Sequence, residues 1–164
     1  MSTPTHIIVG AVIAKLAIEH GIVPDAEHIA YTVGILSANI PDADVLFVRH
    51  PTSHRQSGSH YPIIWAMLLV ICWLLIDITG NTELMGYFSV ATAGLLTHFI
   101  LDVFAMGDGI RWFAPFSKKM IRLLPRAPYI PDDVLEFTKM YLRHPIMILE
   151  IILWAIGLYF LMEG

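Results

Sequence analysis

Charged residues are scarce in this sequence, and their scarcity indicates the class of protein. Only 15% of the 164 residues are charged and 56% are hydrophobic, whereas a soluble domain usually carries about 25% charged residues. The excess of apolar side chains needs an apolar environment, which a lipid bilayer supplies. The net charge of −4 is too small to indicate nucleic-acid binding.

Several other features are missing, and each excludes something. The single cysteine, Cys72, lies in an apolar run, so no internal disulfide is possible. No Lys or Arg precedes the first apolar stretch, which argues against a cleaved signal peptide. The absence of a G-x-S-x-G motif speaks against a serine hydrolase. Without an internal repeat or a linker, residues 1–164 are expected to form a single helical membrane domain.

No alternating apolar and polar pattern persists, so the sequence predicts an all-α fold. We expect an up-down helical bundle of about five helices, at least three of them membrane-spanning, because crossing a bilayer takes about 20 largely apolar residues. The first two helices are shorter and form either short spans or a buried hairpin. The expected ranges are 5–19, 25–39, 62–79, 83–106 and 146–162, with a short amphipathic helix over 132–143.

Ionisable residues are expected to gather at one end of this bundle. Short links between the first and second helices, and between the third and fourth, make each pair antiparallel neighbours. The start of the first helix, the end of the second, the start of the third and the end of the fourth then meet. The residues brought together in this way are His6, Asp42, Asp44, His54, His60, His98, Asp102 and Asp108.

His98 and Asp102 are the most informative pair among these residues. Their spacing of four places both on one helix face, with roughly 5–6 Å between Cβ atoms, and imidazole and carboxylate are common zinc ligands. A buried His hydrogen-bonded to a carboxylate has the same spacing. However, the pair interrupts the apolar run GLLTHFILDVF, where an Asp costs about 2.5–3.5 kcal/mol on insertion scales. This setting favours a metal site.

Other ionisable residues are interpreted more simply. Asp42 and Asp44 follow a helix end, where two carboxylates oppose the helix dipole and slightly favour a nearby cation, although an ordinary turn has the same residues. Glu150 lies in the last apolar helix and is expected to pair with a neighbouring helix. The remaining histidines are assigned no role: His20, His28, His50 and His144.

Five motifs, taken in order, resemble the LexA-regulated, membrane-bound metal-dependent hydrolase family. They are Thr5-His6, Ile40-Pro41-Asp42-Ala43-Asp44, His54-Arg55 with His60, Thr97-His98 with Leu101-Asp102, and the segment Gly109 to Ser117. The pattern is also similar to the zinc-dependent phospholipase C fold, which uses a helical His-x-x-x-Asp pair and an N-terminal His. The resemblance implies a hydrolase whose His and Asp residues bind metal.

The mechanism implied by this resemblance uses one or two divalent ions, zinc or alternatively manganese. The expected ligands are His6, Asp42, Asp44, His54, His60, His98 and Asp102. A metal-activated water would attack a phosphoester or phospholipid. Arg55 would stabilise the developing negative charge, and Asp108 would act as an orienting group or base. The partners are then the lipid bilayer and a small-molecule or lipid substrate, without nucleic acid; the oligomeric state is left open.

Two rival interpretations compete with the enzyme. One is a non-enzymatic membrane protein that binds metal for structure, sensing or transport, although transporters place polar residues near the bilayer midplane. The other is a haem bundle with two histidine ligands, but His98 has no helical His partner at its level.

Basic residues predict the orientation in the inner membrane. Loop Lys and Arg favour the cytoplasmic side, so the His/Asp site is expected to face the cytoplasm. The residues that belong to the two long connections at the site end are Arg49, Arg55, Arg111, Lys118, Lys119, Arg122, Arg126, Lys139 and Arg143.

Overall fold

The computed structural model describes residues 1–23, 26–46, 57–107, 109–125, 127, 131 and 133–163. Within these residues the chain is all-helical, as the sequence predicts, and has no strand beyond an isolated antiparallel bridge between Ile110 and Ile121. Two of the helices are short 3-10 helices. The elements are α1 (Thr3–Glu19), α2 (Glu27–Asn39), η1 (Ile40–Leu46), η3 (Gly58–His60), α3 (Pro62–Thr79), α4 (Thr82–Asp102), α5 (Val134–Arg143) and α6 (Ile146–Met162).

The turn between α3 and α4 follows from its residues. Gly80 ends α3 with a φ of 63°, a left-handed conformation that glycine adopts without steric cost. Asn81 then caps α4, because its side-chain oxygen accepts a hydrogen bond of 2.9 Å from the Leu84 N–H. The cap therefore lies at Asn81, and the helix begins one residue earlier than the sequence indicated.

α4 also ends earlier than the expected Met106. Beyond Asp102 the backbone bonds tighten to the i→i−3 type, from Val103 to Ile100 and from Phe104 to Leu101. The carbonyls of Val103 and Met106 instead accept hydrogen bonds from the Leu123 and Ala127 N–H groups. The connection that follows α4 thus supplies the hydrogen-bond donors that a longer helix would have supplied, and α4 ends at Asp102.

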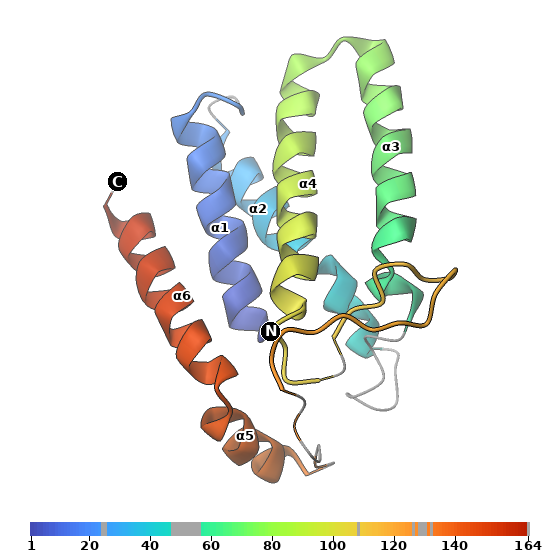
Figure 1. Cartoon of the computed structure of the whole chain (residues 1–164). Coiled ribbons are helices and arrows are strands. Elements are labelled where there is room, and N and C mark those ends of the chain that lie inside the picture. The colour runs from blue at the N-terminus through green and yellow to red at the C-terminus, as the bar shows by residue number, and fades with distance from the viewer. Residues whose placement is uncertain are drawn as a thin grey trace.

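From α1 to α4, successive helices run in opposite directions, whereas α5 lies across their axes (Figure 1). α1 and α2 form one antiparallel pair, and α3 and α4 form the other. The start of α1, the end of α2, the start of α3 and the end of α4 consequently lie at the lower end in Figure 1, close to the N-terminus. This lower end is called the site end below.

Small residues let α1, α2 and α4 approach closely. A Cβ added to Gly10 would lie 2.5 Å from the carbonyl oxygen of Gly34 in α2. One added to Gly94 in α4 would lie 2.2 Å from Ser37 Oγ and 3.1 Å from the Gly34 oxygen. Side chains larger than glycine would push these backbones apart. The close crossing brings the end of α2 against the last turns of α4.

The outer helices expose apolar surface in the manner of a membrane protein. α3 and α4 are each long and apolar enough to cross a membrane, and α5 and α6, bent by 77° at their junction, pass the same test together. α3 buries none of its side chains within the protein, and Ile78 is 82% exposed. Exposed apolar surface on this scale needs lipid around it.

Candidate metal centre

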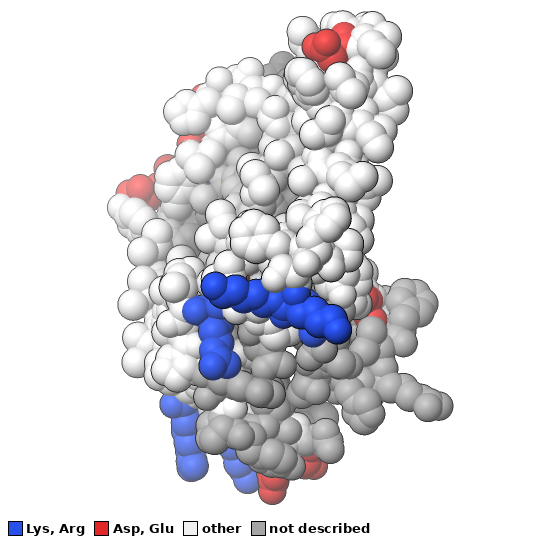
Figure 2. Space-filling view, turned by 45° about the vertical axis from the view of Figure 1, so that its right-hand side comes forward, with Lys and Arg blue, Asp and Glu red and all other residues white. Residues whose placement is uncertain are grey.

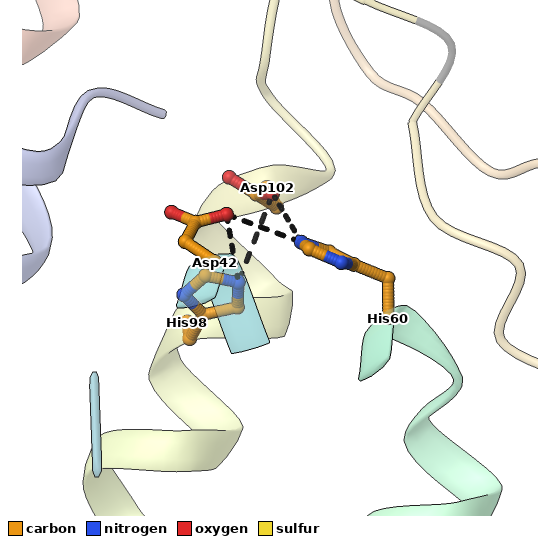
Figure 3. A group of neighbouring side chains, drawn as sticks. All are labelled: Asp42, His60, His98 and Asp102. Carbon is orange, nitrogen blue, oxygen red and sulfur yellow. Dashed lines mark hydrogen bonds and ion pairs between the residues drawn. The ribbon is translucent and has the colours of Figure 1, made fainter. Parts of the chain in front are cut away.

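Four side chains converge at the site end. Asp42 comes from η1, His60 ends η3, and His98 and Asp102 lie in the last turns of α4. Each offers one donor atom, and these four atoms all lie within 4.8 Å of one another (Figure 3). We call Asp42, His60, His98 and Asp102 the quartet.

The spacing of the donor atoms within the quartet suits a single ion. His60 Nε2 lies 3.2 Å from Asp42 Oδ1 and 4.0 Å from Asp102 Oδ2. His98 Nε2 lies 3.9 Å from the same two oxygens. In a tetrahedral zinc site with bonds of 2.0–2.2 Å, neighbouring donors lie about 3.3–3.6 Å apart. The quartet needs only small adjustments to reach that spacing.

The ring of His98 is oriented by the backbone of α2. Its Nδ1 lies 2.8 Å from the carbonyl oxygen of Ala38, and because a carbonyl can only accept, Nδ1 carries the proton. In the neutral ring, Nε2 then presents its lone pair to the quartet. This Nε2 is buried and has no hydrogen-bond partner among the described residues, as expected of a ligand atom without its ion.

His60 is oriented from behind by Asp44. Its Nδ1 lies 3.2 Å from Ser59 Oγ and 3.4 Å from Asp44 Oδ2. The Asp44 carboxylate in turn accepts a hydrogen bond of 2.6 Å from Ser59 Oγ and another from Ser57 Oγ. The Nε2 of the His60 ring lies within hydrogen-bond distance of Asp42 Oδ1. With its proton on Nδ1, facing Asp44, the ring would instead offer the Nε2 lone pair to an ion, in the carboxylate–histidine arrangement common at metal sites. Asp44 therefore lies beside the quartet and contacts its histidine.

The Asp42 carboxyl is held in its charged form. Burial works to raise its pKa, but the hydrogen bond with His60 and the nearby rings of His98 and His6 together lower the pKa to about 2 from a usual 3.8. The carboxylate is consequently available as an anionic donor at neutral pH.

His6 lies at the edge of the quartet. Its ring stacks on that of His98 with centroids 4.3 Å apart, and its Nε2 lies 3.3 Å from Asp102 Oδ1. Both ring nitrogens are buried without a hydrogen bond to a described residue. The amino group of Met1 contacts the same Asp102 oxygen. Asp102 thus presents Oδ2 to the quartet and Oδ1 to His6.

Glu150 anchors the start of α1 beside this site. Its carboxylate accepts hydrogen bonds of 2.7 and 2.8 Å from the N–H and Oγ of Ser2, and one of 2.6 Å from the Tyr141 hydroxyl. Trp154 donates instead to Thr5 Oγ1 at 2.8 Å. The expected pairing of Glu150 thus involves α5 and the start of α1, which carries His6.

A comparison with protein families gives a match over the whole chain. The family described as YdjM inner membrane protein matches residues 1–164. The chain belongs to this family. Searches of curated proteins and of solved structures each gave no match.

In this YdjM family member, three of the predicted site residues, His54, Arg55 and Asp108, lie outside the described residues. The sequence did not indicate Ser57, Ser59 or the Ala38 carbonyl as parts of the site. A pair of serines around a His-containing loop is a weak signal, and a backbone carbonyl leaves no signal in the sequence at all.

Proposed function

We propose that this chain is a membrane-bound, metal-dependent hydrolase of a phosphoester or phospholipid. The observation that carries the proposal is the quartet, in which two imidazole nitrogens and two carboxylate oxygens meet at nearly ligand spacing. Its chemistry fits zinc, with manganese as the alternative. A divalent ion bound there supplies a Lewis acid and lowers the pKa of a bound water to about 7.

The residues around the quartet have distinct roles in this proposal. Asp44 holds His60, and the Ala38 carbonyl holds His98, so that both rings keep Nε2 turned inward. In the two-ion form, His6 and the second oxygen of Asp102 would hold the second ion, in place of the contact between that oxygen and the Met1 amino group.

Three further residues complete the proposed machinery. His54 adds a ligand. The Arg55 guanidinium stabilises negative charge on a phosphoryl group. Asp108 orients a neighbouring group or accepts a proton.

Four protein donors also favour a second candidate, a non-enzymatic metal site for structure or sensing. Structural zinc sites are closed by four protein ligands, whereas catalytic sites keep an open position. Measuring substrate turnover distinguishes the hydrolase from the non-enzymatic metal site. The zinc-loaded and manganese-loaded protein would be assayed on a chromogenic phosphodiester and on phospholipid micelles, beside Asp102→Asn and, at the far end of α3, Asp77→Asn.

If the protein is a hydrolase, the wild type should turn over substrate, Asp102→Asn should abolish this activity and Asp77→Asn should retain it. A protein that binds one ion tightly and turns over none of these substrates with either metal would instead support the structural site.

We further propose an up-down arrangement of at least three spans, α3, α4 and α6, in the inner membrane, with the site facing the cytoplasm. Lys and Arg side chains gather on the lower part of the molecule, and the upper part of the face in Figure 2 shows none. Loop Lys and Arg favour the cytoplasmic side, which supports this orientation.

A further inference from the structure

A hollow of about 500 Å³ lies at the bend between α5 and α6. Apolar side chains, among them Met140 and Pro145, form part of its lining, together with two basic side chains, Lys139 and Arg143. These two cations are four residues apart and share one face of α5. Among the described residues neither has an ion-pair partner, so both charges are available to a ligand.

The position of α5 suits the surface of a bilayer. α5 meets α6 at 77°, so that if α6 crosses the membrane, α5 lies nearly along its surface. The helix is strongly amphipathic, and one side packs Phe137 and Tyr141 against the protein. Leu135 and Leu142, seven residues apart, remain 62% and 59% exposed. Such a helix is typical of the interface between headgroups and acyl chains.

We propose that this hollow binds the phosphate of an anionic phospholipid headgroup. Arg143 and Lys139 supply donors for the phosphate oxygens. The apolar part of the lining and the neighbouring exposed leucines accommodate the start of the acyl chains. The ring nitrogens of His144 are already used, since Nδ1 accepts the Ile146 N–H and Nε2 donates to the Pro125 carbonyl.

Glu136 carries a charge that opposes an anion in this hollow. It is one of the lining residues, and its carboxylate repels a phosphate. Removing this charge must therefore strengthen binding, whereas removing either cation must weaken it. A general attraction to an anionic membrane would respond to Glu136 in the same direction, but it would not depend on which basic side chains are kept, so the comparison between pairs of basic residues identifies the site.

The test is a set of binding isotherms with the full chain in zwitterionic detergent at 0.15 M salt. The probes are short-chain phosphatidylglycerol, short-chain phosphatidylcholine and inorganic phosphate. The variants are Lys139→Gln with Arg143→Gln, the matched control Lys118→Gln with Lys119→Gln, and Glu136→Gln. All five positions are on or near the surface, and binding is read without turnover, so the result does not depend on the hydrolase proposal.

The proposal predicts saturable binding of phosphatidylglycerol that the Lys139/Arg143 double variant weakens about thirtyfold, at about fivefold for each basic residue near an anionic surface. Glu136→Gln should tighten binding, and the Lys118/Lys119 variant should leave it unchanged. Equal losses in the two double variants, or equal binding of phosphatidylcholine, would overturn the site. Inorganic phosphate binding as tightly as the lipid would assign the hollow to a soluble anion and overturn the lipid proposal.

Discussion

Replacing Asp44 by Asn distinguishes a residue that orients a ligand from one that is a ligand. In the structure Asp44 contacts His60 Nδ1 at 3.4 Å and accepts hydrogen bonds from Ser57 and Ser59. The substitution keeps the shape of the side chain but removes its charge. We expect His60 to remain in place while its ring becomes less firmly oriented and less basic.

The expected loss follows from this placement. Removing an outer hydrogen-bond partner of a ligating histidine typically costs ten- to a hundredfold in metal affinity, which is about 1.4–2.7 kcal/mol. Asp102→Asn removes a donor of the quartet itself and leaves its buried partners without their anion, so its loss should be much larger. Ser59→Ala removes one of the hydrogen-bonding groups between His60 and Asp44. Its loss of metal affinity should be tenfold or less, the lower limit expected for Asp44→Asn.

The assay is a competition titration of zinc between purified protein in detergent and a chromophoric chelator. Asp77→Asn, at the opposite end of the molecule, is the control and should bind zinc like the wild type. A loss in Asp44→Asn as large as that in Asp102→Asn would mean that Asp44 ligates the ion directly. Unchanged affinity in Asp44→Asn would refute the orienting role.

Three other predictions concern the surroundings of the site. Gly94→Ala shifts α4 slightly away from α2, because the new Cβ would lie 3.1 and 3.2 Å from backbone atoms of Gly34 and Ala38 and would displace the Ser37 hydroxyl. Zinc titration should then show up to about tenfold weaker binding as the histidine–carbonyl bond lengthens; wild-type affinity would refute this packing argument. Glu150→Gln places an amide where a carboxylate accepts three hydrogen bonds. The loss in the free energy of unfolding, about 2 kcal/mol, should lower the thermal midpoint in detergent by roughly 4–8 °C. An unchanged midpoint would contradict the buried network. Single cysteines at Ser57 and Asn81, in a Cys72→Ala background in intact cells, should react with an impermeant reagent only at position 81, and the reverse pattern would remove the cytoplasmic orientation.

The helices and the end of the molecule that carries the site could be predicted from the sequence. Long apolar runs, Pro62 and Gly80 define α3 almost to the residue, because helix ends are signalled locally. The spacing of His98 and Asp102 and the short connections were enough to place Asp42 and His60 beside them. These predictions needed only chain order and helical geometry.

The division of labour among the site residues could not be predicted. Asp42 and Asp44 are two residues apart and look equivalent in the sequence, yet one joins the quartet and the other holds His60 from behind. That difference depends on the path of η1 around the end of α2. The early end of α4 at Asp102 likewise depends on backbone bonds from residues more than 19 positions away, which no local pattern encodes.

The metal content of the purified protein shows whether the quartet binds an ion. Wild-type protein, His98→Ala and the control His28→Ala would be purified without added metal and measured by elemental analysis. We expect about one equivalent of zinc or manganese, or more, in the wild type and in His28→Ala. His98→Ala should lose that ion with its helix content unchanged, because alanine is a good helix former. Equal metal content in the wild type and His98→Ala would contradict this expectation.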